Sequence, residues 1–203
     1  MATKGTATES SPMSWDQFQN LISRMLVDAE HSFKNPDKKE QHIKFLVLIA
    51  IGCYAGLRIG DLLNLCWHDV LQKTSIDVIE QKRKKKRSIT LNANLTKILS
   101  KAYSLYTPDS NDYIFTNADN MVFSVQYINR KLKLIFKQYN VKSSIVSSHS
   151  LRKTFGLRVF EMNFKSDEAL IKLSQMFNHA NTAITRRYIG IQAEAIKDIY
   201  LKL

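Results

Sequence analysis

Cross-linking and chain-breaking residues are scarce in this sequence. Its 203 residues include 2 cysteines, 3 prolines and 6 glycines, whereas 44% are hydrophobic and 10% aromatic. This composition excludes collagen-like, low-complexity and wholly disordered chains. Cys53 and Cys66 fit neither a disulfide framework nor a zinc-binding spacing, which indicates a reducing intracellular compartment. A helix-rich globular domain remains, and the length predicts one domain, or one domain with a small appendage.

A long hydrophobic run is also missing. The longest apolar stretch, residues 45–57, has 13 residues and lies between Lys44 and Arg58. A transmembrane helix needs about 20 residues. No apolar segment near Met1 resembles a signal peptide. We therefore expect no contact with a membrane and a cytoplasmic location.

Acidic side chains are outnumbered. The 30 Lys and Arg residues against 18 Asp and Glu leave a formal charge of +12, and half of this excess lies in residues 82–87, KRKKKR. The balance indicates an anionic partner, with nucleic acid as the first candidate. Such a run repels itself unless phosphates meet it. On charge alone, a solvated loop or a nuclear-localisation look-alike accounts for the run equally well.

The predicted elements are mainly helices. Residues 1–11 are small, polar and without periodicity, so we interpret them as a disordered leader or a cloning remnant. Ser14 and Gln17 form a capping-box pattern at the start of the first helix. A polar break at residues 34–38 precedes a central, evenly apolar helix that continues to about Tyr54. Further helices are expected at residues 59–65, 94–106, 124–139, 150–162, 167–177 and 193–201.

Strand-like segments are few. Residues 75–80 and 88–91 flank the basic run, which predicts a hairpin with a cationic tip. A weaker strand is expected near residues 113–115. No internal repeat is found, and no shift of composition after Ser14 indicates a second domain.

Four stretches carry a pattern of charged and nucleophilic residues: AGLRIGDLLNL from Ala55, KRKKKRSITL from Lys82, HSLR from His149 and FNHANTAITRRYIG from Phe177. In this order and spacing they resemble the catalytic domain of the tyrosine recombinases, the phage integrase family. The resemblance implies an α+β, mainly helical fold with a small antiparallel sheet over residues 12–203. The family's N-terminal core-binding domain is expected to be absent, either by truncation or because the protein is naturally minimal.

The resemblance also assigns six catalytic positions by motif: Arg58, Lys82, His149, Arg152, His179 and Tyr188. Tyr188, nine residues after His179, is the nucleophile. Lys82 matches the hairpin lysine because an Arg, an aliphatic residue and a Leu follow five, seven and nine positions later. Any of the lysines at residues 84–86 could take the role of the hairpin lysine in place of Lys82.

Phosphodiester cleavage needs these residue types for physical reasons. Negative charge grows on the nonbridging oxygens during in-line attack, and the guanidinium groups of Arg58 and Arg152 would each donate paired hydrogen bonds to them. A tyrosine with an ordinary pKa of about 10 needs a proton acceptor, which His149 would supply. The leaving 5′ oxygen needs a proton, which Lys82 would supply. His179 would donate a hydrogen bond to the phosphate.

The spacing within HSLR decides which side chains share a face. His149 and Arg152 are three residues apart, so at a helix start they project together toward one phosphate. Ser148 or His149 is the candidate cap of that helix. Asp61 is not one of the six catalytic positions, and we interpret it as a partner of Arg58.

The nine-residue spacing before Tyr188 requires a break in the chain. Continuous helix would place His179 and Tyr188 on opposite faces. We expect Asn178 to end one helix in a left-handed conformation, and Asn181 or Thr182 to cap the next. Asn178 stands where the family usually has Gly, and residues 60–61 are Gly-Asp where Ser and Glu are more usual.

The resemblance implies a site-specific recombinase that cuts and rejoins DNA through a 3′-phosphotyrosyl intermediate, without ATP, metal or any other cofactor. Its implied partners are double-stranded DNA, three further protomers in a synaptic tetramer, and accessory DNA-bending proteins, in the nucleoid of a bacterium. The role is integration or excision of a mobile element. We expect DNA contacts from Arg83, Lys84, Lys85, Lys86, Arg87 and Arg187. The last predicted helix docks either on its own domain or on a neighbouring protomer.

Three alternatives remain at this point. A type IB topoisomerase shares much of this constellation but relaxes DNA without pairing sites. A DNA-binding accessory protein would keep the fold without catalysis. A metal nuclease would use Asp61, His68 and Asp69.

Overall fold

The computed structural model describes residues 10–79, 86–191 and 200. Its helices are α1 (Trp15–His31), α2 (Pro36–Ala55), α3 (Ile59–Leu62), the 3-10 helix η1 (Trp67–Asp69), α4 (Ala93–Ser104), α5 (Val125–Gln138), α6 (Ser148–Met162), α7 (Asp167–Phe177) and α8 (Thr182–Tyr188). Its strands are β1 (Ser75–Ile79) and β2 (Lys86–Thr90). The predicted helix at 193–201 lies outside the described residues apart from Tyr200.

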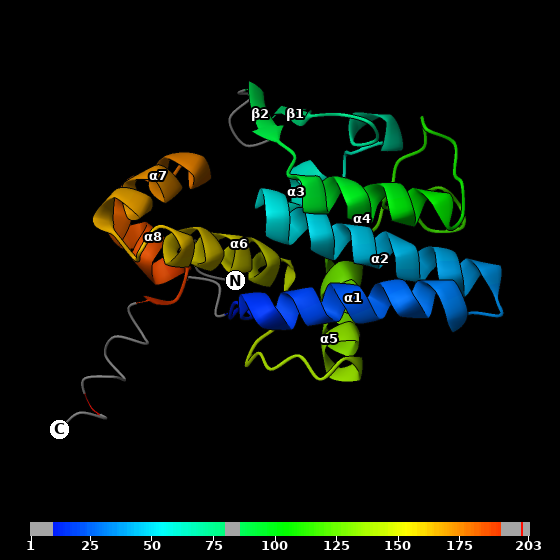
Figure 1. Cartoon of the computed structure of the whole chain (residues 1–203), viewed down its shortest axis with the longest axis horizontal. Helices are drawn as coiled ribbons and strands as arrows, with labels where there is room; N and C mark the ends of the chain where they lie inside the picture. The colour runs from blue at the N-terminus through cyan, green and yellow to red at the C-terminus, as the bar shows by residue number, and fades with distance from the viewer. Residues whose placement is uncertain (1–9, 80–85, 192–199, 201–203) are drawn as a thin grey trace, which may run out of the picture.

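The predicted fold class is confirmed, because the described residues form a mainly helical domain with one small antiparallel sheet (Figure 1). In this sheet β1 pairs with β2 in a register that runs from Ser75 opposite Thr90 to Ile79 opposite Lys86. The expected strand at residues 113–115 is wrong, since only isolated bridges join Tyr113 to Cys66 and Thr116 to Val122. No helix among the described residues is long and apolar enough to cross a membrane.

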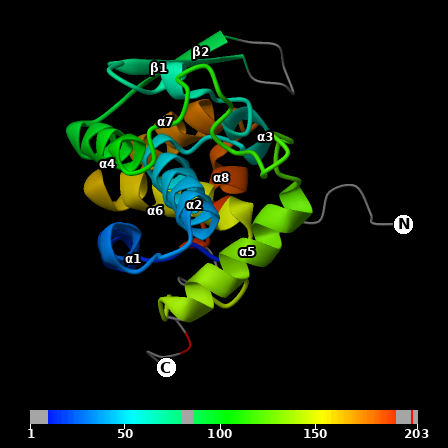
Figure 2. The same ribbon diagram turned by 90° about the vertical axis from the view of Figure 1, so that its right-hand side faces the viewer.

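Helix α2 is the centre of the domain, as its even hydrophobicity predicts. Every residue from Ile43 to Cys53 is buried, and α1, α4 and α6 all pack against it (Figures 1 and 2). The helix begins at Pro36, inside the predicted polar break. Asn35 caps it, because its side chain accepts a hydrogen bond from the amide of Lys38 (2.9 Å), and proline suits the first helical turn.

Residues just before the predicted boundary at Pro12 make contacts with the domain. The amide of Ser11 donates to the carbonyl of Ile145 (2.9 Å), and the amide of Met13 donates to the Thr154 hydroxyl (3.1 Å). The ammonium of Lys153 donates to the carbonyl of Ser10, which is buried. Residues 10–13 therefore lie along α6 rather than forming the end of a disordered leader, while residues 1–9 lie outside the described part.

The last helices form a second, smaller apolar cluster. Phe160 of α6 packs there with Leu170, Leu173 and Phe177 of α7 and with Ile189 after α8. The main core lies on the α2 side of α6. Helix α6 therefore joins the two clusters: its Phe155 lies against Gly56 at the end of α2, and its Gly156 lies against Phe177 and Ile189.

Gly56 ends α2 where the chain turns toward Arg58. It adopts φ 60° and ψ 29°, and a Cβ at this position would collide with the ring of Phe155. Gly190 has φ +87°, but its nearest atom to an added Cβ is Pro12 Cδ at 3.9 Å. The two glycines thus share a left-handed backbone and differ in the space around them.

We expect Gly56→Ala to destabilise the domain more than Gly190→Ala. The left-handed conformation costs about 1–2 kcal/mol for a residue with a Cβ, in either variant. Overpacking against Phe155 adds about 1–3 kcal/mol for Gly56→Ala alone. Urea unfolding of both variants measures the difference. Equal losses of unfolding free energy would show that Phe155 moves aside freely.

Candidate active site

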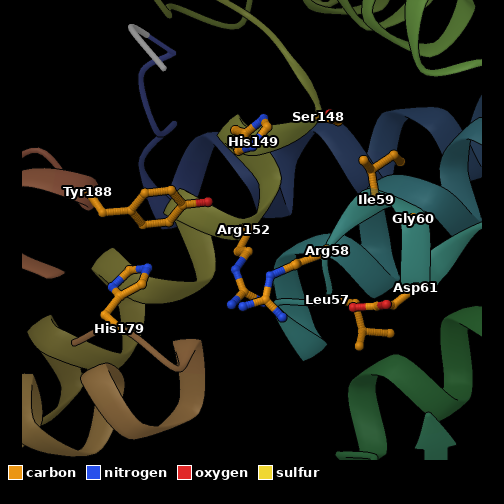
Figure 3. A pocket seen from close by; sticks show the side chains of 10 residues that line it. All are labelled: Leu57, Arg58, Ile59, Gly60, Asp61, Ser148, His149, Arg152, His179 and Tyr188. Carbon is orange, nitrogen blue, oxygen red and sulfur yellow. The ribbon is translucent and has the colours of Figure 1, made fainter. Parts of the chain in front are cut away.

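Five of the six predicted catalytic residues line one pocket of about 310 Å³. They are Arg58, His149, Arg152, His179 and Tyr188 (Figure 3). The rest of the wall consists of residues 57, 59–61 and 148. The sixth, Lys82, lies outside the described residues, as do Arg83, Lys84 and Lys85.

The two arginines converge on a single backbone oxygen. Arg58 Nη2 donates to the carbonyl of Phe177 at 2.9 Å, and Arg152 Nη2 donates to the same oxygen at 3.3 Å. This carbonyl ends α7, where the helix dipole leaves partial negative charge. Arg58 and Arg152, which are far apart in the sequence, thus bind the same carbonyl oxygen of the protein. Both guanidinium groups are therefore positioned before any phosphate binds.

Arg152 is the more enclosed of the two arginines. Its side chain is 5% exposed, its Nη1 donates to the carbonyl of Gly56, and its guanidinium carbon lies 4.2 Å from the centroid of the Phe177 ring. A planar guanidinium lies flat on an aromatic ring while its rigid fork donates in two fixed directions, whereas a lysine ammonium is a compact point charge without that fork. The site therefore fits arginine specifically at position 152.

A third arginine reaches the same end of α7. Arg87 Nη1 of β2 donates to the carbonyl of Met176 at 2.6 Å. This bond docks the hairpin that carries the basic run onto the helix end that holds Arg58 and Arg152. Arg87 was expected to contact DNA, but its half-buried guanidinium is already engaged within the protein. Lys86 and Arg187, also expected to contact DNA, are exposed.

The expected break before Tyr188 is confirmed. Asn178 adopts the left-handed conformation, with φ 57° and ψ 46°, and ends α7. The side chain of Asn181 accepts a hydrogen bond from the amide of Ile184 (3.0 Å) and caps α8. The turn brings the His179 and Tyr188 rings to 5.2 Å between centroids, although continuous helix would have separated them.

The start of α6 differs from expectation. Ser147, not Ser148 or His149, is the cap: its hydroxyl accepts from the amide of His149 at 3.2 Å. In return its amide donates to the Ser150 hydroxyl at 3.2 Å. The cap lies one residue earlier because Ser150 completes a reciprocal capping box. His149 and Arg152 consequently both lie inside the helix and both line the pocket.

Tyr188 is packed rather than exposed. The centroid of its ring lies 5.4 Å from the centroid of the Phe177 ring and 5.3 Å from the ammonium nitrogen of Lys153. Burial raises the pKa of the Tyr188 hydroxyl, while the charges of Arg152 and Arg58 and a hydrogen bond from Arg152 act to lower it. The phenol is therefore protonated at neutral pH and needs a proton acceptor to become a nucleophile.

Both pocket histidines are biased toward their neutral forms. Burial lowers the pKa of His149, and the charges of Lys153 and Arg152 lower it further. Burial, followed by the charges of Arg152 and Arg58, lowers the pKa of His179 to about 4. A neutral imidazole has a free lone pair, so His149 is able to accept a proton at neutral pH.

Asp61 lies buried in the pocket wall beside Arg58. It does not join His68 and Asp69 as a ligand set: within residues 10–79, 86–191 and 200, no three His, Cys, Asp or Glu side chains cluster as a metal site would require. The sequence singled out neither Lys153 nor Thr185, although both contact residues of the pocket. Their positions offered a weak signal, directly after HSLR and three residues before Tyr188.

The fold defines a class of protein. The XerA recombinase superimposes with a TM-score of 0.67 at 24% identity, covering 100% of this chain and 66% of its own. The XerH site-specific recombinase was solved on a palindromic difH substrate after cleavage. It superimposes with a TM-score of 0.67 at 17% identity, and the match covers 98% of this chain and 56% of the XerH chain. The domain therefore has the fold of a tyrosine recombinase catalytic domain.

Sequence similarity makes the assignment narrower. Residues 13–195 match the sequence profile of the phage integrase family. The probable integrase/recombinase YoeC of Bacillus subtilis is 30% identical over 158 residues, which are 75% of this chain and 81% of YoeC. The chain belongs to the phage integrase family. It spans about two thirds of the XerA chain and just over half of the XerH chain.

Proposed function

We propose that this protein cuts and rejoins DNA strands at specific sites through a covalent 3′-phosphotyrosyl intermediate. The observation that carries the proposal is that Arg58, Arg152 and Tyr188 of one chain line one pocket. A phosphate placed there would be a second shared acceptor of the two guanidinium groups, beside the Phe177 carbonyl. Relatives named as recombinases and integrases support this activity.

The proposed step is an exchange of one ester for another. The Tyr188 oxygen attacks the scissile phosphorus while its proton passes to His149. The bond to the 5′ oxygen breaks, and this oxygen takes a proton from Lys82. Arg58 and Arg152 stabilise the charge on the nonbridging oxygens. Because the new phosphotyrosyl bond conserves the energy of the old one, rejoining is the same step in reverse and requires neither ATP nor metal.

Recombination requires more than one active site, so the proposal extends to an assembly. XerH was solved on a difH substrate, and a lambda integrase of similar fold was solved as a dimer bound to a core site. For this chain we propose a synaptic tetramer on double-stranded DNA in the bacterial cytoplasm, serving integration or excision of a mobile element. DNA-bending proteins would assist it, and residues beyond 191 would either stay on their own domain or exchange between protomers.

Covalent capture tests the proposal. Randomly nicked genomic fragments are incubated with the protein in EDTA, adducts are precipitated with SDS and potassium, and the attached DNA is sequenced. A recombinase should enrich a short inverted-repeat site. The recovered duplex then serves as the substrate for every variant below.

Two outcomes would redirect the assignment. Relaxation of a plasmid without the recovered site would favour a type IB topoisomerase. Binding to the genomic fragments with no adduct at any nick position would favour a non-catalytic accessory protein.

The dependence of cleavage on pH tests His149. As the acceptor it must be neutral, and its lowered pKa keeps it neutral to a more acidic pH than an exposed histidine. We expect the second-order rate constant of adduct formation, which reports on the free enzyme, to fall on the acid side with a midpoint below pH 6.5, the ordinary value. His149→Gln should remove this limb, and His31→Gln, at an exposed site, should keep it. A limb unchanged in His149→Gln would exclude His149 as the acceptor.

A further inference from the structure

Thr185 contacts His179 from inside the protein. The hydroxyl of Thr185 lies 2.9 Å from Nδ1 of His179, and the Thr185 side chain is fully buried. The same hydroxyl lies 3.4 Å from the carbonyl of Asn181, to which a threonine inside a helix usually donates, so this carbonyl and Nδ1 compete for one hydroxyl hydrogen. With Nδ1 occupied in this way, Nε2 is the ring nitrogen that remains for a ligand in the pocket.

The number of hydrogens restricts how this contact is made. A neutral imidazole carries one N–H, and a threonine hydroxyl carries one O–H. If Nδ1–H donates to Thr185, then Nε2 presents a lone pair to the pocket. If the Thr185 hydroxyl donates to Nδ1, then Nε2–H faces the pocket as a donor.

We propose that Thr185 is a positioning residue that donates its hydrogen bond to Nδ1 of His179 and so holds Nε2–H toward the scissile phosphate. The shorter of its two contacts is the one to Nδ1. Only this arrangement gives a neutral His179 a donor for a nonbridging oxygen. The alternative would need a protonated ring, which burial opposes first and the charges of Arg152 and Arg58 oppose further.

The proposal also accounts for the place of Thr185 on α8. It lies three residues before Tyr188, so one short helix holds both the nucleophile and the group that fixes His179. The turn at Asn178 and Asn181 brings His179 back over that helix. The phosphate donor and the nucleophile are consequently set by the same element. This consequence rests on the proposed function, whereas the hydrogen bond itself does not.

Nitrogen NMR of the histidine side chains tests the hydrogen bond without DNA. In the full chain, the signals of His179 are identified by their loss in His179→Gln. We expect Nε2 protonated and Nδ1 unprotonated at pH 7, the same pattern in Thr185→Ser, and a mixture of tautomers in Thr185→Val. A protonated Nδ1 in the unmodified protein would overturn the proposal, whatever the enzyme does to DNA.

The rate of adduct formation on the captured duplex tests the consequence. Thr185→Val should lower the rate about tenfold, the effect of one misdirected donor, with unchanged DNA binding. Thr185→Ser should recover the rate to within about twofold. Thr182→Val is the matched control, since it removes a hydroxyl at the start of the same helix and should leave the rate unchanged. A Thr185→Val protein that keeps its full rate would also overturn the proposal. If the unmodified protein forms no adduct but shows the expected tautomer, the proposed function fails and the hydrogen bond stands.

Discussion

Tyr188→Phe is expected to abolish the SDS-resistant adduct between protein and DNA. The substitution removes one oxygen and keeps the ring that packs against Phe177 and His179. Without that oxygen no phosphotyrosyl bond forms, so the expected loss is complete to the detection limit. DNA binding should remain nearly intact, because the cationic groups of the pocket are unchanged. Gel analysis of the captured duplex after SDS treatment measures the adduct, and a mobility shift without SDS measures binding.

The chain offers a matched control for this variant. Tyr200 is 74% exposed and also lies near the carboxyl end, and Tyr200→Phe should form the adduct at the normal rate. An adduct that survives Tyr188→Phe would show that Tyr188 is not the nucleophile. An adduct lost only in Tyr200→Phe would assign the nucleophile to Tyr200.

Mixing an inactive and an impaired protein tests which chain supplies the tyrosine. Tyr188 lies in the pocket of its own chain, so cleavage should use Arg58, Arg152 and Tyr188 of one protomer. Tyr188→Phe mixed with Arg152→Lys should then give no adduct beyond that of the second protein alone. Recovery on mixing would show that a neighbouring protomer supplies the nucleophile.

The motifs made much of the site predictable because each charged residue has a fixed local relation to its neighbours. His149 and Arg152 share a helix face because residues three apart in any helix lie on the same side. The asparagines before Tyr188 allow a turn that a continuous helix would not contain. The central helix was predictable because burial on all sides leaves an evenly apolar sequence. These features depend on local sequence, which a single chain displays.

The support of the site was not predictable, because it is made by backbone atoms distant in sequence. The carbonyl of Phe177 gathers Arg58 and Arg152, and the carbonyl of Met176 holds Arg87. No side-chain pattern marks a carbonyl as an acceptor. The sequence did not reveal that Arg87 bonds a helix end, since a basic run looks the same whether its members face phosphate or a carbonyl; its contact with DNA stays a prediction.

The cap of α6 shows the same limit on a smaller scale. Three serines lie within residues 147–150, and each is a good helix cap by residue type. Ser147 takes the role because the hydroxyl of Ser150 bonds back to its amide. A choice among equivalent residues is decided by a reciprocal bond and not by propensity.

Arg152→Lys is expected to lower the rate of adduct formation about 10²- to 10³-fold, the usual cost of removing a donor that stabilises transition-state charge. A lysine keeps the positive charge but loses the fork, so one ammonium cannot bond the Gly56 carbonyl, the Phe177 carbonyl and a phosphate oxygen together. It also loses the stacking of the guanidinium on the Phe177 ring. We therefore expect a loss of unfolding free energy of about 1–3 kcal/mol as well.

A second arginine of α6 separates the two effects. Arg158 lies over the Trp15 ring, 5.1 Å from its centroid, and is not part of the pocket wall. Arg158→Lys removes a comparable stacking contact, so it should lower the unfolding free energy while the rate of adduct formation stays normal. Urea unfolding and the adduct rate are measured on both proteins. If Arg158→Lys slows cleavage as much as Arg152→Lys, the rate depends on the packing of α6 and not on a guanidinium at the phosphate. A normal rate in Arg152→Lys would remove the clamp from the mechanism, because the charge alone would then be sufficient.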